Sequence, residues 1–254
     1  MNSGDHLLSI LQLFTDEKSE WTVEEASKAI KVSASTAYRY FRSLCNAGLL
    51  DRFSSGDYVL GPAIIEFDRR IRLVDPLIQV ARPVMERLVS RSNNTGVALL
   101  CRIYRNRVMC VHQELAEVFE HPIGYERGRS LPMFLGAYSK IILANLSSRS
   151  TRWFFTRFQQ EISEAGLGND WEQLKANLRR IRKAGVSVTK GEIDSGRVGI
   201  AAPVLGFNGS VIGSVGLVLF DRDATPENVA SFSALVQAAG REIDAALLAH
   251  PKSS

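Results

Sequence analysis

Two arginines, a serine and an asparagine recur at helical spacing between residues 34 and 47. At 100° per residue, one face of a helix there would carry Ser35, Arg39, Arg42 and Asn46. Guanidinium groups can bind guanine edges or phosphates, and short hydroxyl and amide side chains can reach phosphates and bases. Because a helix fits the major groove, this face has the chemistry to read DNA. The alternative is that the two arginines only solvate an exposed helix.

The residues around this helix carry the start and stop signals of a helix-turn-helix. Thr22, with Glu25 three residues later, is a capping box, so a helix is expected to begin there and run through residue 29 or 30. Ser33 can cap the second helix, which is expected over residues 34–47. The inner face of that second helix is expected to carry Ala37, Tyr40, Phe41 and Leu44.

Two short strands are predicted after the second helix. Gly48 stands where a left-handed residue would end the helix. Residues 49–53 and 58–60 then read as strands around a polar turn at residues 54–57, which is the pattern of a wing. The candidate DNA-binding residues of this winged helix-turn-helix are Ser33, Ser35, Thr36, Tyr38, Arg39, Arg42, Ser43, Asn46 and Arg52.

The formal net charge of +4 is not concentrated where DNA contact is expected. Residues 1–75 contain 9 Lys or Arg against 11 Asp or Glu, whereas residues 76–254 contain 22 against 16. Residues 31–56 carry four basic side chains and one acidic one. One copy would therefore neutralise few phosphates and bind weakly at physiological salt. The expected binding species is a homodimer on palindromic half-sites of double-stranded DNA.

Length and composition indicate a globular chain of two domains. The 254 residues are 45% apolar and 23% charged, which is ordinary for a folded protein with a sizeable core. Three cysteines without a C-x-x-C pair are expected to be reduced, buried thiols of a cytoplasmic protein. No signal peptide and no apolar run of membrane-spanning length is found, so no membrane partner is expected.

The expected organisation is a winged helix-turn-helix over residues 1–61, a linker over residues 62–75 with a helix at 63–73, and an α+β domain with an antiparallel sheet over residues 76–254. A first helix is expected behind Asp5, with apolar positions through Phe14. The remaining patterns predict helices over 76–90, 137–146, 149–165, 171–184 and from Thr225 onward, and strands over 95–103, 107–115, 118–125, 186–193, 198–205 and 211–220. Pro83 is expected to kink the first of these helices or to start its second segment. Gly166 and Gly185 are expected to close the helices over 149–165 and 171–184, Asn208-Gly209 to form the hairpin turn between the last two strands, and residues 250–254 to fray.

No linear signature of catalysis is present. The chain lacks G-x-S-x-G, H-E-x-x-H and the phosphate-binding loop G-x-x-x-x-G-K-[ST], so it is not predicted to be an enzyme or to hold a cofactor. His112 and His121 could approach Cys110 in a metal site, but surface or core histidines are the favoured interpretation. The basic run at residues 179–183 is interpreted as complementing a helix dipole in water rather than as a nucleic-acid contact.

Several separated motifs occur in the order found in one family. Leu131-Pro132 precedes Lys140 at the start of a helix, and Arg182-Lys183-Ala184-Gly185 precedes a strand. With these, nearly the whole chain resembles the IclR family of bacterial transcriptional regulators through Ser35-Thr36-Ala37-Tyr38-Arg39, Gly61-Pro62, the stretch from Gly128 to Ala144, and Gly199-Ile200-Ala201-Ala202-Pro203-Val204. The resemblance implies a winged helix-turn-helix, a linker helix and a GAF-like effector-binding domain. It also implies dimers or tetramers on palindromic operators, with a small-molecule effector controlling a repressor or activator.

The resemblance further implies an effector pocket between the sheet and the loop and helix around residues 131–137. The candidate effector-binding residues are Leu131, Phe134, Ala137, Tyr138, Thr189, Arg197, Gly199, Gly216 and Val218. Many members have a histidine where Phe134 stands, some have an acidic residue at Thr189, and some have serines at Gly216 and Val218. The pocket is therefore expected to be less polar on its sheet side.

Arg197 is the candidate anchor for a ligand carboxylate, because its planar fork can pair with two oxygens at once. The expected effector is an organic or aromatic acid lying on Tyr138, Phe134 and Leu131. Arg197 could instead be an exposed turn residue after Asp194-Ser195-Gly196. Two rival functions also stay open, since the second domain could be an enzyme or a ligand-free dimerisation domain fused to a DNA-binding module.

Overall fold

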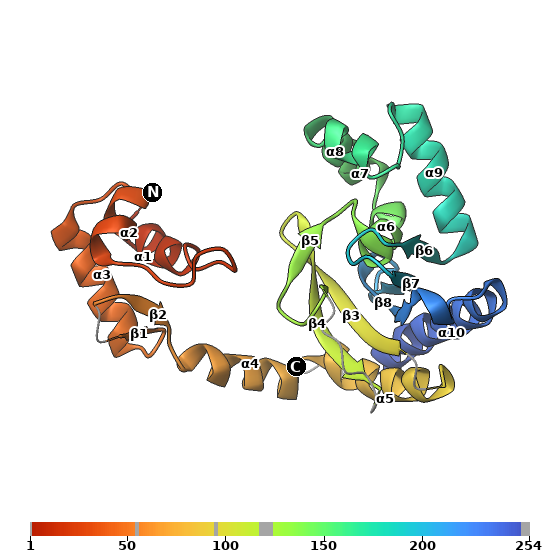
Figure 1. Ribbon diagram of the computed structural model, residues 1–254, viewed down its shortest axis with the longest axis horizontal. Coiled ribbons are helices and arrows are strands. Elements are labelled where there is room, and N and C mark those ends of the chain that lie inside the picture. The colour runs from red at the N-terminus through yellow and green to blue at the C-terminus, as the bar shows by residue number, and fades with distance from the viewer. Residues whose placement is uncertain (1, 54–55, 94–95, 117–123, 250–254) are drawn as a thin grey trace. The chain divides into compact units, whose positions relative to one another are not determined.

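The chain folds as two units that meet in sequence between Asp75 and Pro76 (Figure 1). The computed structural model describes residues 2–53, 56–93, 96–116 and 124–249. Helices and an antiparallel sheet are both present, as the α+β expectation required. Among these residues, no helix is long and apolar enough to cross a membrane.

The first unit opens with two capped helices, α1 (Ser3–Leu11) and α2 (Val23–Ala29). The predicted capping box of α2 is confirmed, because Thr22 Oγ1 accepts from the Glu25 amide at 3.2 Å and Glu25 Oε2 accepts from the Thr22 amide at 3.1 Å. The start of α1 was predicted too late. Asn2 caps it and Asp5 lies inside its first turn, where its carboxylate completes a second capping box.

Helix α3 (Ala34–Asn46) buries the face that the sequence predicted, with Ala37, Tyr40, Phe41 and Leu44 in the core. Ser33 Oγ caps it by accepting from the Thr36 amide at 3.2 Å. Gly48 has φ +67°, and the Leu49 amide donates to the Leu44 carbonyl at 2.9 Å, so the predicted left-handed end of the helix is confirmed.

The wing consists of strands β1 (Leu50–Arg52) and β2 (Tyr58–Leu60), which pair antiparallel. Trp21 forms an isolated antiparallel bridge with Tyr58, which ties the segment before α2 to the wing. The predicted wing turn at residues 54–57 falls partly on residues 54–55, outside the described residues. After the wing, α4 (Ala63–Val74) extends the predicted linker helix by one residue.

The second unit is built on a six-stranded antiparallel sheet with strand order β5-β4-β3-β8-β7-β6 (Figure 1). Its long central strands are mostly buried, because helices cover both faces of the sheet. The strands are β3 (Gly96–Tyr104), β4 (Arg107–Leu115), β5 (Ser130–Pro132), β6 (Ser187–Lys190), β7 (Arg197–Leu205) and β8 (Val211–Phe220).

Helices form a layer on each face of this sheet. On one face, α5 (Pro76–Arg91) and α10 (Pro226–Ala249) enclose a core with alternate residues of β3, β7 and β8. The opposite face packs against α6, whose residues from Gly136 to Ala144 are all buried. The helices of this second layer are α6 (Gly136–Asn145), α7 (Ser148–Arg157), α8 (Gln159–Glu164) and α9 (Trp171–Ala184).

In the second unit, the turns and helix ends that depend on a glycine or a cap were predicted correctly. Gly209 has φ +71° in the predicted Asn208-Gly209 turn between β7 and β8. Gly166 and Gly185 are left-handed after α8 and α9, as predicted. Thr225 Oγ1 accepts from the Asn228 amide at 3.2 Å at the start of α10.

Three predictions for the second unit were wrong or fall elsewhere. The strand predicted over residues 118–125 lies mostly on residues 117–123, outside the described residues, and Gly124 and Tyr125 are not in a strand; the edge strand is β5. The helix predicted over 149–165 is two helices, because Phe158 leaves helical geometry at φ −132°. Pro83 does not divide α5, which runs unbroken from residue 76 to 91.

Candidate functional site

The candidate DNA-reading face of α3 is open to solvent. Arg39, Arg42 and Asn46 are exposed, and Tyr38 is 56% exposed. In the part of the chain that the structure describes, neither arginine forms an ion pair. Ser33, Ser35 and Ser43 are also exposed, whereas Thr36 is half-buried and its Oγ1 accepts from Ser33 Oγ at 2.8 Å. The exposed side chains therefore lie on the face of the helix that the sequence predicted to be turned toward solvent.

Two of the candidate hydroxyl groups also serve the helix itself. Ser33 Oγ is the cap of α3, and Ser43 Oγ donates to the Arg39 carbonyl at 3.1 Å. On the wing, Arg52 is exposed and its guanidinium carbon lies 5.9 Å from the centre of the Tyr58 ring. These contacts fix where the polar groups sit relative to the helix and the wing.

A pocket in the second unit lies between α6 and strands β6, β7 and β8. Six of the nine candidate effector residues line it: Ala137, Tyr138, Thr189, Arg197, Gly199 and Val218. The cavity has a volume of about 30 Å³, so the pocket is narrow. A side chain at Gly199 would lie 3.4 Å from Ala137 Cβ and 3.5 Å from Thr189 Oγ1, so glycine keeps this gap open.

The other three candidates are not among the described lining residues. Leu131 lies in edge strand β5 and pairs with Val108 of β4. Phe134 is in the core beneath α7 and α8, with its ring centre 5.7 Å from that of Phe158. At Gly216 a Cβ atom would lie 2.0 Å from the Ile200 carbonyl oxygen, so this glycine serves the close approach of β7 and β8.

Arg197 begins β7 and is half-buried, so it is not the exposed turn residue that the sequence left as an alternative. Its guanidinium carbon lies 3.7 Å from the centre of the Phe220 ring, and that of Arg222 lies 4.5 Å from the same centre. Burial lowers the pKa of Arg197, and the carboxylate of Asp194 acts in the opposite direction. Stacking on Phe220 thus holds a cation at the pocket wall.

Sequence reasoning missed the loop that forms one wall of the pocket. Gly191, Glu192, Ile193 and Asp194 all line it, and the strand predicted over 186–193 ends at Lys190. Glu192 Oε1 accepts from Lys140 Nζ at 2.6 Å, and its Oε2 accepts from the Gly136 amide at 3.0 Å. The available signal was the pair of glycines at 191 and 196, which both have positive φ.

The inner wall of the pocket carries groups that stay neutral at physiological pH. Tyr125, which was also missed, stacks edge-on against Tyr138 with ring centres 5.8 Å apart. Burial raises the pKa of both tyrosines, and it raises that of the neighbouring Cys101 thiol as well. A ligand therefore meets apolar and neutral polar atoms at this wall, and the charged side chains that line the pocket are those of Glu192, Asp194 and Arg197.

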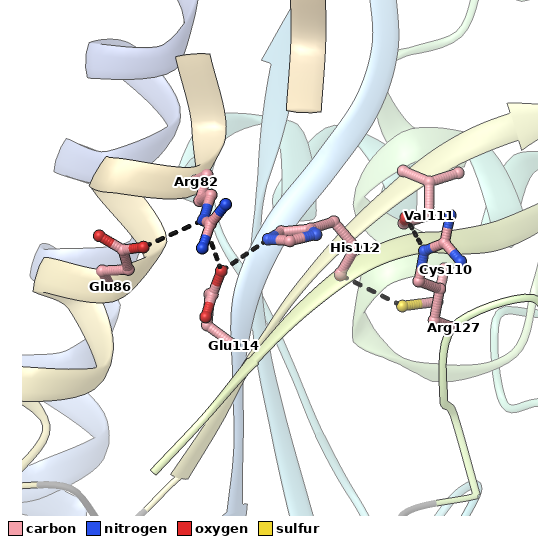
Figure 2. Close-up of polar contacts among 7 residues, drawn as sticks. All are labelled: Arg82, Glu86, Cys110, Val111, His112, Glu114 and Arg127. Atoms are coloured by element: carbon pink, nitrogen blue, oxygen red, sulfur yellow. Dashed lines mark hydrogen bonds and ion pairs between the residues drawn. The ribbon is translucent and has the colours of Figure 1, made fainter. Parts of the chain in front are cut away.

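A separate polar network joins α5 to β4, as Figure 2 shows. Glu114 Oε1 lies 2.7 Å from His112 Nε2 and 3.7 Å from Arg82 Nε, and Arg82 also pairs with Glu86. His121 of the conceivable metal site lies outside the described residues. Within the ranges that are described, no three His, Cys, Asp or Glu side chains are grouped to hold a metal ion.

The basic run of α9 differs in part from its interpretation as a purely solvated face. Arg182 Nε donates to the Ala144 carbonyl at 2.6 Å, and its terminal nitrogen donates to the Leu146 carbonyl at 2.8 Å. These carbonyls lie at the end of α6, so Arg182 joins two helices. Arg179, Arg180, Arg182 and Lys183 are all exposed, so Arg182 differs from the other three by its contacts rather than by its burial.

A winged helix-turn-helix followed by a separate α+β domain defines a class of DNA-binding transcription regulators. Residues 4–52 match the family described as the IclR helix-turn-helix domain. Residues 74–245 match the one described as the bacterial transcriptional regulator IclR C-terminal domain. The chain belongs to the IclR family, whose members are DNA-binding transcriptional regulators and not enzymes.

Two transcriptional regulators are similar to this chain over nearly their full length. The HTH-type transcriptional regulator XynR of Escherichia coli (strain K12) is 26% identical over 249 residues, which cover 97% of each chain. KipR of Bacillus subtilis (strain 168) is 25% identical over 93% of each chain.

Solved structures of IclR regulators share the fold. A regulator from Brucella abortus has a TM-score of 0.80 at 16% identity and covers 99% of this chain and 93% of its own. An IclR homologue from Microbacterium hydrocarbonoxydans, solved in complex with 4-hydroxybenzoate, has a TM-score of 0.73 at 21% identity and covers 98% of this chain and 100% of its own.

Proposed function

We propose that this IclR-family regulator binds paired operator half-sites as a homodimer or tetramer, and that an organic acid in the second unit controls its affinity. In this proposal residues 1–61 bind DNA, residues 62–75 link, and residues 76–254 bind the effector and a second subunit. The observation that carries it is the pocket in which six separated candidate residues meet around Arg197.

The proposed ligand class follows from the pocket walls. Tyr125, Tyr138, Ala137 and Val218 offer apolar and aromatic surface, and Arg197 offers a guanidinium fork that can pair with a carboxylate. An aromatic acid such as a benzoate satisfies both. The Microbacterium homologue, whose structure contains 4-hydroxybenzoate, supports this class of ligand.

Control of DNA binding requires two arrangements that the ligand binds unequally. A ligand with equal affinity for both would leave operator affinity unchanged, however tightly it bound. We propose that α4, the helix that leads from the wing to the second unit, carries this coupling. The ligand therefore shifts the spacing of paired α3 helices rather than the chemistry of either one.

Replacing Arg197 tests the effector site. The full-length protein is titrated with benzoate, 4-hydroxybenzoate and the neutral analogue benzamide, and melting temperature and operator affinity are both recorded. Arg197→Ala should weaken binding of the acids about 10- to 100-fold and leave benzamide unaffected, because it removes a charge-assisted hydrogen bond. Arg222→Ala is the matched control, since Arg222 stacks on the same Phe220 ring but does not line the pocket.

Each outcome of this titration separates the candidate functions. Unchanged acid binding in Arg197→Ala would remove Arg197 as the anchor. If no carboxylic acid alters the melting temperature or operator affinity of the unmodified protein, the second unit is a ligand-free dimerisation domain. Loss in Arg197→Ala but not in Arg222→Ala supports the proposed effector site.

Replacing an arginine of α3 tests the DNA-reading face. Arg42→Ala should weaken operator binding by about 1–3 kcal/mol if the guanidinium reads a base, with relaxed specificity at one position. A phosphate contact would instead weaken all sequences alike and lower the salt slope by about 1. Arg39→Ala is measured in parallel, and Arg241→Ala in α10 is the control. Wild-type affinity and salt slope in both α3 variants would contradict the assignment.

A further inference from the structure

Residues 191–196, here named the strap, form one wall of the pocket and are hinged at both ends. Gly191 and Gly196 have φ values of +66° and +75°, which side-chain-bearing residues rarely adopt. The Gly191 amide donates to the Arg197 carbonyl at 2.8 Å, and the Gly196 carbonyl accepts from the Asp221 amide at 2.8 Å. The strap therefore leaves and rejoins the sheet at two fixed points, with three lining residues between them.

Two carboxylates fasten the strap across the pocket. Glu192 bonds to Lys140 Nζ and to the Gly136 amide of α6, and Asp194 Oδ2 accepts from the Gly124 amide at 2.6 Å. Both amides belong to glycines for a steric reason. A Cβ on Gly136 would lie 2.5 Å from Ile193 Cδ1, and one on Gly124 would lie 2.1 Å from Asp194 Oδ1.

Lys140 determines which kind of ligand can replace Glu192. The residue is only 6% exposed, and besides Glu192 its Nζ donates to the Ala165 carbonyl at 3.0 Å. A buried ammonium that loses its carboxylate is strongly unfavourable. A neutral molecule that moved the strap would leave that charge uncompensated, whereas a ligand carboxylate could replace Glu192 without changing the local charge.

We propose that Glu192 is an internal occupant of a second carboxylate position in the pocket, at Lys140, and that an acidic ligand displaces it and releases the strap. This inference rests on the proposed function in that the displacing ligand is the organic acid effector. Arg197 and Lys140 then have different roles. Arg197 lines the pocket as it stands, whereas Lys140 becomes available only when the strap moves.

Chemical rescue tests the position at Lys140 without any effector. Glu192→Ala should melt several degrees below the unmodified full-length protein, and sodium acetate at tens of millimolar should restore much of that loss at constant ionic strength. Acetamide should not, because it carries no charge. Glu192→Ala combined with Lys140→Met should not respond to acetate. The control is Glu172→Ala, which breaks the exposed pair with Lys175 on α9.

Failure of rescue overturns the inference. Acetate that stabilises the single and double variants equally, or neither of them, shows that no carboxylate position exists at Lys140. Should Glu192→Ala not fold, Glu192→Gln serves instead, read by hydrogen exchange. Faster exchange at the Gly136 amide than in the unmodified protein, slowed again by acetate while the strap keeps exchanging fast, supports the inference, and unchanged exchange overturns it.

Titration with benzoate separates this inference from the proposed function. Glu192→Gln should bind benzoate at least about 10-fold more tightly than the unmodified protein, because the internal competitor has lost its charge. Rescue by acetate with no aromatic or aliphatic acid affecting operator binding would retain the Lys140 position and remove the effector proposal. Acid-responsive operator binding without acetate rescue would do the reverse.

Discussion

At the scale of single residues, burial decides which thiols can react. Cys101 and Cys110 face each other across β3 and β4 and are fully buried, while Cys45 in α3 is half-buried. Burial raises the pKa of the Cys101 thiol. It also raises that of Cys45, with a smaller contribution from the negative charge of Asp51. All three are free, so the sequence expectation of unpaired thiols is confirmed and that of full burial is wrong for Cys45.

These environments predict a graded reaction with a thiol reagent such as Ellman's reagent at pH 7.5. Cys45 should react first, about 10-fold or more below the rate of free cysteine, because the thiolate is the nucleophile and its fraction is reduced. Cys101 and Cys110 should react only when the second unit unfolds. Absorbance gives both phases, and Cys45→Ser should remove the fast one. Three equivalents reacting at one rate in the folded protein would contradict this ordering.

At the scale of elements, sequence predicted what local interactions decide. The Thr22 and Glu25 capping box, the buried face of α3 and the Asn208-Gly209 turn each depend on residues only a few positions apart. The strap and β5 were missed because their conformations depend on distant partners. Glu192 is held by Lys140, 52 residues away, and no periodicity in either segment reveals that pair. The family resemblance did identify six lining residues, because a family pattern relates positions that are far apart in the sequence and close together in the fold.

The contact between the strap and α6 gives a prediction for Gly136. Gly136→Ala should destabilise the protein by the cost of a left-handed alanine, about 1–2 kcal/mol, plus the cost of moving Ile193. Gly166→Ala is the matched control, because its φ of +69° is similar and no atom lies within 4 Å of its added Cβ. Urea unfolding of both variants measures the difference. Equal losses would show that Ile193 moves freely and that the strap is loose.

At the scale of the whole molecule, the first unit carries an apolar helix face that none of the described residues of that unit buries. Helix α4 has no buried residue, and its side chains at 3, 4, 3 spacing form a stripe of Ile64, Phe67, Ile71 and Val74. Exposed stripes of this kind mark contact surfaces. Since residues 31–56 carry only a small positive excess, pairing through such a stripe would supply the second reading helix that the charge count requires.

The stripe predicts that self-association and operator affinity fall together. Ile71→Glu places a charge at the centre of the stripe and should shift the full-length protein toward smaller species in sedimentation equilibrium. Leu73→Glu is the control, because Leu73 is equally exposed but lies on the opposite side of the same helix. Loss of simultaneous half-site contact should weaken operator binding about 100-fold or more in Ile71→Glu. If the second units alone hold the dimer together, sedimentation will stay unchanged and only operator affinity will fall. That result would mean that the stripe sets the spacing of the two α3 helices and does not contribute to assembly. Unchanged sedimentation and unchanged affinity would leave the stripe without a role in either.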